Sequence, residues 1–576
     1  MVRTDHGFHA HIMAPGHTAP MLLSSVLRSL GLALVIAPAA WAQADTPTAT
    51  AAVSRPVPAA AAAAEPARFD VLEYEVVGNS MLPARVIEAA VLPHMGEQRS
   101  LADVDAARAA LEGAYQDAGL LTVFVDVPEQ RIDGGLVRLV VTEGRVERVR
   151  VTGARWFSQG YIRANTPALV EGGVPDFNQL QAQLGELNRG PDRQVQPVLR
   201  TGHAPGTMEV ELKVQDQWPM SGSLELNNKH SASTSATRLV ATLRHDNLLQ
   251  RDQGLALTLT TAPEAPAQSQ VLAASWTSPL SAASSLVTSL VWSNSRTEPL
   301  GATVLGSGLT LGLRWAHTRF GEASSHTVTL GGEFRDLKQN VGNGDSGVAT
   351  PLRYLPLQAG YSGQWTHAGD GPRAQTSLAV NLAFGLRGLL ARRIACPGNT
   401  LDGQQDQFAC NRDGADGGFV TLRTDLRHSR PFAGGTLALR AAGQAATQAL
   451  VSGEQFTLGG ADTVRGYFES EAVGDMALLA SLEWRSRNLL GAAAAPIGTP
   501  PLALAALVFA DLARAWLIDP LPEQAPYPSL AGAGLGLQLR LGSRGSADLD
   551  LAWPLKPTRN SPSRQPRLHA RVGLQF

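Results

Sequence analysis

From Trp218 to the last residue, the chain consists of short segments in which apolar and polar residues alternate. In the final segment, the apolar residues Leu568, Ala570, Val572, Leu574 and Phe576 alternate with Arg567, His569, Arg571, Gly573 and Gln575. Successive side chains of a β-strand point to opposite faces, so each such segment would have one apolar and one polar face. This pattern restricts the region to β-sheet with a different environment on each side.

The number of segments and the lengths of their connections favour a transmembrane barrel over a soluble β-sandwich, which alternation alone would also fit. Between Ser221 and Phe576 we count about sixteen runs of about ten residues, an even number of the kind that bacterial barrels have. Short connections such as 320–323 lie between long ones such as 296–308 and 337–353. The sequence therefore predicts a mainly β fold, a sixteen-stranded antiparallel transmembrane β-barrel over residues 217–576.

One uncharged segment, from Leu489 to Ala510, has about the length that a membrane helix needs. Pro496, Pro500 and Pro501 would break such a helix, because proline has no N–H to donate. We interpret the segment as a turn followed by a strand.

The N-terminus has the features of a secretory signal peptide over residues 1–42. An apolar stretch is followed by Ala40-Trp41-Ala42, which has the small-x-small form of a cleavage site and would leave Gln43 as the mature N-terminus. Translation could start at Met1, with a long n-region, or at Met21. A Pro/Ala-rich linker follows at 43–68, with a composition that does not build a core.

Between the linker and the barrel, the pattern predicts two small α+β domains of similar order, at 69–143 and 144–216. The first contains a strand from Val71 to Asn79, a short helix from Pro83 to Leu92 and a longer helix that begins at Ser100. In the second, a strand from Val146 and a helix over about 177–187 repeat this order, and two closing strands complete each domain.

Cys396 and Cys410 are the chain's two cysteines, and they lie close together in a polar stretch without nearby histidine. A local disulfide in an oxidising compartment is the leading interpretation, and two free thiols are the alternative. No zinc site or other metal site is predicted, and no cofactor. Lys and Arg are scattered along the chain, which argues against a nucleic-acid-binding stripe.

The segment 459–467 reads Gly-Gly-Ala-Asp-Thr-Val-Arg-Gly-Tyr, and its last four residues are Val464, Arg465, Gly466 and Tyr467. Leu482-Glu483-Trp484-Arg485 and Phe509-Ala510-Asp511 follow on the next two predicted strands. With two units similar to polypeptide-transport-associated (POTRA) domains and a sixteen-strand barrel, these motifs resemble the two-partner secretion transporters. This is the TpsB family of haemolysin-activator and filamentous-haemagglutinin transporters. A glycine that the family has two residues after the Asp is Ala513 here.

The resemblance implies that the loop carrying Arg465 folds back into the lumen and meets an acidic side chain on the inner wall. By strand parity, Asp511 and Glu483 face inward near Phe509, so the guanidinium could make a forked contact that lysine could not reproduce. Taken alone, the loop sequence would equally fit a turn before a strand.

The resemblance also implies a protein of the Gram-negative outer membrane whose POTRA domains lie in the periplasm. These domains would capture a large secreted exoprotein, of the adhesin or haemolysin type, for export through the barrel. Outer-membrane lipid and the barrel-assembly machinery, which would recognise the final strand ending in Phe576, are the other expected partners.

Three other functions compete with export. An assembly factor that inserts other outer-membrane proteins shares the architecture, a solute porin would not need residues 69–216, and a hydrolase would need an activated nucleophile that the sequence does not show. We therefore expect no enzymatic activity. Members of the family often thread an N-terminal helix through the barrel, but the residues from Gln43 to Arg68 are too few for such a helix and its tether.

Overall fold

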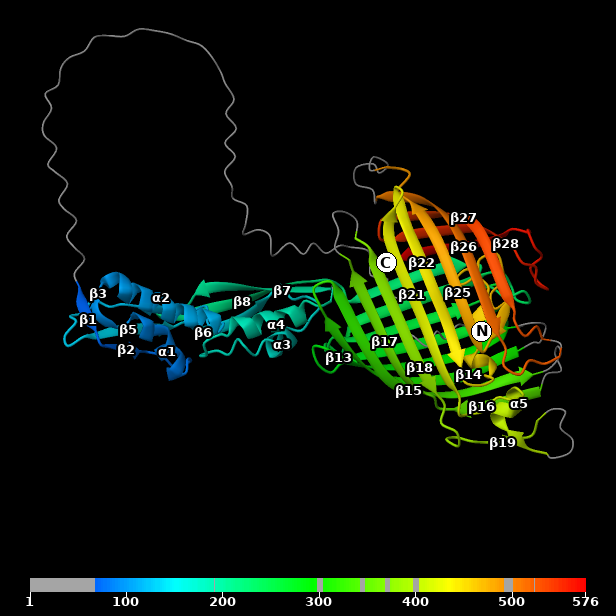
Figure 1. Ribbon diagram of the computed structural model, residues 1–576, viewed down its shortest axis with the longest axis horizontal. Helices are drawn as coiled ribbons and strands as arrows, with labels where there is room; N and C mark the ends of the chain where they lie inside the picture. The colour runs from blue at the N-terminus through cyan, green and yellow to red at the C-terminus, as the bar shows by residue number, and fades with distance from the viewer. Residues whose placement is uncertain are drawn as a thin grey trace, which may run out of the picture.

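The protein was analysed as a computed structural model, which describes residues 68–190, 192–297, 304–341, 348–367, 373–396, 403–491, 501–522 and 524–576. The predicted signal peptide, with its cleavage site, and all but the last residue of the predicted linker lie outside the described residues. The described chain forms two small α/β units and a closed β-barrel, and Figure 1 shows the second unit between the first unit and the barrel. This confirms the predicted fold class. Among the described residues, no helix is both long and apolar enough to cross a bilayer.

The first unit packs two helices against a three-stranded sheet of order β2-β5-β4, in which β2 and β5 are parallel. A capping box starts α2, because Ser100 and Asp103 each accept a hydrogen bond from the other's main-chain N–H. Leu111 and Tyr115 of α2 are fully buried against Leu139 of β5. The elements are β1 (Phe69–Val71), β2 (Glu73–Val77), α1 (Ala84–Val91), the 3-10 turn η1 (Leu92–His94), β3 (Gly96–Arg99), α2 (Leu101–Asp117), β4 (Val123–Asp126) and β5 (Leu136–Glu143).

The prediction of one strand from Val71 to Asn79 is wrong at its start. The chain divides at Leu72, whose N–H donates to the carbonyl of Gly135 at 2.8 Å. β1 pairs instead with β3, a short strand that the sequence pattern did not indicate. A two-strand ladder of three or four residues is set by pairing between distant segments, which local alternation does not reveal.

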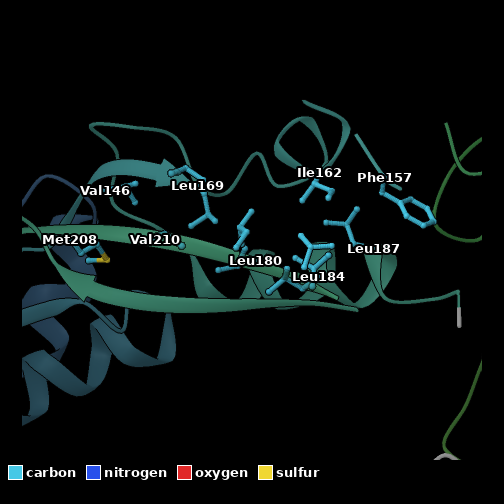
Figure 2. Packing of buried hydrophobic residues seen from close by; sticks show 13 residues of the cluster. Val146, Phe157, Ile162, Leu169, Leu180, Leu184, Leu187, Met208 and Val210 are labelled. Carbon is cyan, nitrogen blue, oxygen red and sulfur yellow. The ribbon is translucent and has the colours of Figure 1, made fainter. Parts of the chain in front are cut away.

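The second unit repeats the arrangement, with sheet order β6-β8-β7 and β6 parallel to β8. Figure 2 shows its core, in which Leu180, Leu184 and Leu187 of α4 pack with Ile162 and Val210. The short helix α3, which the sequence pattern did not single out, is capped by the Ser158 hydroxyl. The elements are β6 (Arg145–Thr152), α3 (Gln159–Ala164), α4 (Phe177–Leu187), β7 (Arg193–Thr201) and β8 (Thr207–Asp216).

The barrel closes through antiparallel pairing of its last strand, β29, with its first, β9. β16 and β17 are two pieces of one interrupted strand, because β15 pairs with β16 over one half of its length and with β17 over the other. The barrel therefore has the sixteen strands that the sequence predicts. Its segments are β9 (Met220–Asn227), β10 (Arg238–Leu248), β11 (Gln253–Thr261), β12 (Ser269–Pro279), β13 (Ser284–Thr297), β14 (Val304–Phe320), β15 (Ser324–Val341), β16 (Val348–Tyr354), β17 (Leu357–Thr366), β18 (Gln375–Phe384), β21 (Val420–Phe432), β22 (Gly435–Ala446), β25 (Met476–Ser486), β26 (Leu502–Trp516), β27 (Ser529–Leu541), β28 (Gly545–Pro554) and β29 (Arg567–Gln575).

The two faces of the barrel wall have the predicted characters. Leu535, Leu537, Leu568 and Val572 are exposed on the outside, where lipid would contact them, whereas His569 of β29 is buried on the inside. The segment that we interpreted as a turn and a strand is β26 from Leu502 onward. Alternation therefore reports the difference between lipid and lumen.

The two ends of the barrel differ in their connections. One end, the turn end, carries mostly short turns such as 249–252 and 542–544, and the other, the loop end, carries the predicted cysteine loop and the loop with Arg465. The long loops predicted at 296–308 and 337–353 are shorter than expected. The β13–β14 ladder continues to the pair Thr297 and Val304, and the β15–β16 ladder to Val341 and Val348, so cross-strand pairing extends through residues that we assigned to loops.

Candidate functional site

The loop between β22 and β25, residues 447–475, folds back into the barrel and is called here the inward loop. It contains a 3-10 turn, η4 (Ser452–Glu454), and a small hairpin of β23 (Phe456–Leu458) and β24 (Ala472–Gly474). Gly459 and Gly460 follow β23 with φ of 100° and 101°, values that favour glycine. The segment Val464 to Tyr467 lies between the two hairpin strands in the sequence and is buried against the inner wall.

Arg465 makes the forked contact that the sequence predicts with Asp511. Its Nε and Nη2 donate to the two carboxylate oxygens of Asp511 at 2.8 and 3.0 Å, and its main-chain N–H donates to the same carboxylate at 3.1 Å. Nη1 donates to Glu483 at 2.9 Å. The side chain of Asp511 has no exposed surface, so Arg465 neutralises a fully buried charge.

Three further groups complete the surroundings of this guanidinium. Asp550 of β28 lies 3.4 Å from Arg465 Nη1, and it is a third carboxylate that the sequence analysis did not identify. The guanidinium carbon lies 3.4 Å from the centre of the Phe509 ring, in cation–π geometry. Ser481 donates its hydroxyl to Asp511 at 2.6 Å, which satisfies that carboxylate further.

Gly466 and Tyr467 fix the next part of the loop. Gly466 has φ of 97°, and a Cβ there would lie 2.9 Å from the nitrogen of Pro554, so only glycine fits without movement. Its N–H donates to Nε2 of His569 at 2.9 Å. The Tyr467 hydroxyl donates toward the carbonyls of Ala531 and Lys556, at 2.9 and 2.7 Å, and accepts from the N–H groups of the same two residues.

Apolar packing supports these polar contacts. Val464 and Tyr467 are fully buried with Leu479 of β25 and Leu530 of β27, in a cluster that also includes small residues of β22 and β26. Ala513, where the family has glycine, belongs to this cluster. The alanine is accommodated, and the loop is docked on the wall formed by β22 and β25–β28.

The inward loop is also held at the loop end of the barrel. Asp475 is fully buried at the end of this loop and forms a two-point ion pair with Arg412. It also accepts hydrogen bonds from the main-chain N–H groups of Leu450 and Ile518. Arg412 caps the short helix α5 (Gln407–Asn411), which lies in the 385–419 loop together with β19 (Arg393–Ile394) and β20 (Gln405–Asp406). Three loops therefore meet at one carboxylate.

Cys396 and Cys410 are joined in a disulfide within that 385–419 loop, with their Cα atoms 5.6 Å apart. Cys410 belongs to α5, two residues before Arg412. The bridge therefore constrains the segment that presents the guanidinium to Asp475.

A second buried ion-pair cluster holds the start of the inward loop. Arg335 of β15 donates to Glu454 of η4 at 2.5 Å and to Glu333 at 2.6 Å, and the Tyr354 hydroxyl donates to Glu454 at 2.9 Å. Arg314 pairs with the same Glu333. The sequence analysis missed this cluster. Strand parity could have indicated it, because Arg335 and Glu333 lie two residues apart on the inward face of β15.

At the turn end, the second unit is bound to the β10–β11 turn. Arg193 at the start of β7 makes a two-point contact with Asp252 of that turn, at 2.9 and 2.8 Å, and the Tyr161 hydroxyl donates to the same carboxylate at 3.0 Å. Gln250 accepts from the N–H of Ser158 at 2.8 Å. These contacts fix the position of the second unit beneath one part of the barrel rim.

One group of side chains in the described residues has the donor types of a metal site. Ligand atoms of Glu147, His203 and Glu209 in the second unit lie within 4.8 Å of one another. Glu147 already accepts hydrogen bonds from Thr207 and from the main chain of His203, and the His203 ring is largely exposed. We interpret the group as a surface cluster that holds the β7–β8 hairpin.

Comparisons with known proteins give one family. The chain matches the sequence model of the haemolysin secretion/activation proteins ShlB/FhaC/HecB over residues 206–539. It matches that of the ShlB-type POTRA domain over residues 69–144.

Among curated proteins, it is 26% identical over 185 residues to the outer membrane transporter CdiB of Escherichia coli, a match that covers 31% of this chain and 30% of that protein. It is 28% identical over 134 residues to CdiB of Dickeya dadantii (strain 3937), 23% of each chain. The matched region thus spans less than a third of these curated relatives.

Several solved structures share the fold, including the following two. CdiB from Escherichia coli superposes with a TM-score of 0.58 at 20% identity, over 90% of this chain and 93% of that one. BamA from Haemophilus ducreyi lacking POTRA domains 1-3 superposes with a TM-score of 0.52 at 15% identity, over 88% of this chain and 100% of that one. At these identities, the likeness concerns the fold.

Proposed function

Because the chain belongs to the ShlB/FhaC/HecB family of haemolysin secretion/activation proteins, we propose that it is the export pore of a two-partner secretion system. It is a protein of the outer membrane, with its POTRA units in the periplasm. The turn end of the barrel is then periplasmic and the loop end faces outward. The exported partner would be a large exoprotein of the adhesin or haemolysin type.

The observation that carries this proposal is the docked inward loop, whose Arg465 neutralises a fully buried Asp511 inside the lumen. A passive porin has no need for two periplasmic units in front of its barrel. We therefore assign the loop a positioning role, in which its docked state sets the shape of the channel. No chemical step and no enzymatic activity form part of the proposal.

Capture of the partner would use an open strand edge of the POTRA units. In β7 the edge is partly closed, because the Asn188 side chain bonds both main-chain groups of Val195, and Pro197 has no N–H to offer. The edge strand β4 of the first unit presents the main chain of Val125 away from β5, beside Phe124, which is 58% exposed. We infer that an extended segment of the exoprotein adds to β4.

The C-terminal strand supports assembly by the cell's barrel-assembly machinery. Phe576 pairs its main chain with Gly222 of β9 in both directions, at 2.8 and 3.0 Å, and its side chain is exposed. An aromatic residue presented to lipid at the closing seam would be accessible to that machinery during insertion.

The test is deletion of residues 69–143 with the barrel left intact. We expect the variant to reach the outer membrane but to leave the exoprotein encoded in a neighbouring reading frame in the periplasm. Normal export by this variant would overturn the docking role of the first unit.

The assembly-factor alternative makes a different prediction. If the chain inserted other barrels, as a BamA-like protein does, loss of the gene would lower the amounts of unrelated outer-membrane proteins. We expect those amounts to stay unchanged while the exoprotein alone is lost from the medium, and quantitative proteomics of the membrane fraction measures both.

A further inference from the structure

Three adjacent strands of the sixteen in the barrel wall lack charged side chains over nearly their whole length. β11 and β12 contain no Asp, Glu, Lys or Arg, and neither does β13 before Arg296 at its loop end. Parity is fixed by the exposed Leu257, Trp276 and Trp292, which face outward. The inward residues, called here the uncharged wall, are Gly254, Ala256, Thr258, Thr260, Ser269, Val271, Ala273, Ser275, Thr277, Ser285, Val287, Ser289, Val291 and Ser293.

The opposite part of the wall is charged, and several of its charges form ion pairs. Arg440 of β22 binds Asp425 of β21 at 2.7 Å, and Asp548 of β28 binds both Arg540 and Arg571, at 2.7 and 2.5 Å. The inward loop is docked on this side, through the Arg465 contacts and the apolar cluster of β22 and β25–β27. The segment around Arg465 is therefore docked on this charged wall, whereas the η4 turn of the same loop reaches Arg335 of β15.

The second POTRA unit lies at the periplasmic entrance of the uncharged wall. Its hydrogen bonds from Arg193 and Tyr161 to Asp252, and from Ser158 to Gln250, reach the turn that joins β10 to β11. β11 is the first strand of the uncharged wall. A chain released from the POTRA units would meet this wall first.

An unfolded chain of varied sequence must bind the wall weakly enough to move on. Conduction through a pore requires sites that a passing group can enter and also leave. A wall of free charges would hold oppositely charged segments and repel others, whereas hydroxyls and small apolar groups interact weakly with any sequence. The small side chains of the uncharged wall also leave room in the lumen.

We propose that the exported polypeptide travels through the barrel along the uncharged wall of β11–β13, opposite the docked inward loop. This inference rests on the proposed export function and adds to it the surface that the cargo contacts. The occupant is an extended, unfolded polypeptide, selected by no particular side chain. Specific recognition is left to the POTRA units.

Adjacent alanines on β12 provide a matched test. Ala273 faces the lumen and pairs with Val291, whereas Ala274 faces lipid, so tryptophan at either position adds the same volume to opposite sides of one strand. We expect Ala273→Trp in the full-length chain to lower secretion of the neighbouring exoprotein about tenfold or more, the effect of an added barrier of about 1.4 kcal/mol. Ala274→Trp should secrete nearly normally, and so should the charged-wall variant Ala505→Trp, because the inward-facing Ala505 of β26 pairs with Gln538 away from the Arg465 site.

Cysteine scanning keeps the test decisive if the tryptophan variants assemble poorly. The native cysteines are bridged, so a single cysteine at position 273, 274 or 505 would be the free thiol of the mature chain. With an exoprotein that carries one cysteine and a fused folded domain that stalls it in the pore, we expect a disulfide adduct with Ala273→Cys but not with the other two variants.

The outcomes separate the two proposals. An adduct at position 505 but not at 273, or a normal rate for Ala273→Trp with a block by Ala505→Trp, would overturn the path while leaving export intact. Failure of the wild-type chain to export the exoprotein at all would instead overturn the proposed function.

Discussion

Replacement of Arg465 by alanine is the perturbation whose effect the structure predicts most directly. The change removes the two-point contact to Asp511, which has no exposed surface, and the contact to Glu483. Asp550, 3.4 Å from the guanidinium, loses its neighbour as well. Breaking a buried pair by removing one partner costs about 3–5 kcal/mol, because the remaining charge is left uncompensated.

That cost is comparable with the apolar contribution that holds the loop in place. Complete burial of Val464 and Tyr467 stabilises the docked state by about 1.5–3 kcal/mol for each side chain. Loss of Arg465 would therefore cancel most of the docking free energy. The barrel itself should survive, because its closure rests on the continuous strand ladder and not on the loop.

Arg465→Lys should dock the loop little better than Arg465→Ala does, because an ammonium group cannot make the forked contact with Asp511 and also reach Glu483. The exchange of Arg465→Asp with Asp511→Arg should also fail to restore docking, because aspartate at position 465 would face both Glu483 and Asp550. Arg485→Ala is the matched control. It removes a half-exposed arginine from the same Glu483 and leaves the buried pair intact.

The assay combines three readouts on the same membranes. Heat-modifiable migration reports barrel assembly, planar-bilayer conductance reports the position of the loop, and exoprotein in the medium reports export. We expect Arg465→Ala to assemble, to conduct differently and to secrete little, with Arg485→Ala near wild type. Wild-type secretion and conductance by Arg465→Ala would refute the positioning role of the loop.

Three further predictions follow from the contacts described above. Cys396→Ser should leave barrel insertion intact but expose the 385–419 loop to protease, because the disulfide stabilises that loop by about 3 kcal/mol in the chain-entropy model. Equal protease resistance of the wild type and the variant would contradict this. Arg193→Ala should loosen the second unit from the barrel, at about 2–3 kcal/mol for charge-assisted hydrogen bonds to Asp252, and speed proteolysis between them, whereas the exposed Arg200→Ala should not. Hydrogen bonds from Thr207 and the main chain of His203 lower the pKa of Glu147 from 4.5 to about 2, so its support of the β7–β8 hairpin is complete above pH 4.5 and lost as pH falls toward 2. Glu147→Gln should remove that pH dependence, and hydrogen exchange of the hairpin at pH 6 and pH 3 would show it; an unchanged profile in the variant would count against the assignment.

The sequence was sufficient for the architecture because a barrel wall imposes a local rule. Lipid on one side and water on the other require alternation within each strand, and this alternation can be read without knowing which strands are neighbours. The same parity placed Asp511 and Glu483 on the inner face. Helix caps such as that of Ser100 are equally local, which explains why the longer helices were predicted well.

Other features depended on contacts between distant residues. Three such features are the strand break between β16 and β17, the β1–β3 pair and the extended β13–β14 ladder. Each depends on which strands pair and in which register, and no short sequence pattern encodes that. The inward loop shows the same limit, since Asp550 lies 85 residues from Arg465 in the sequence. Parity made Asp550 a candidate without selecting it.

The sequence by itself determined the approximate number of strands and the two faces of the wall, and it favoured the disulfide. Its resemblance to a known family indicated the arginine that enters the lumen. Only the tertiary structure decided that Arg465 meets three carboxylates, that Asp475 joins three loops, and that the Arg465 site lies on the wall opposite β11–β13. The physical reason is that alternation is a property of neighbours along one strand. Which charges share a space is decided by barrel closure and by the path of a loop across the lumen.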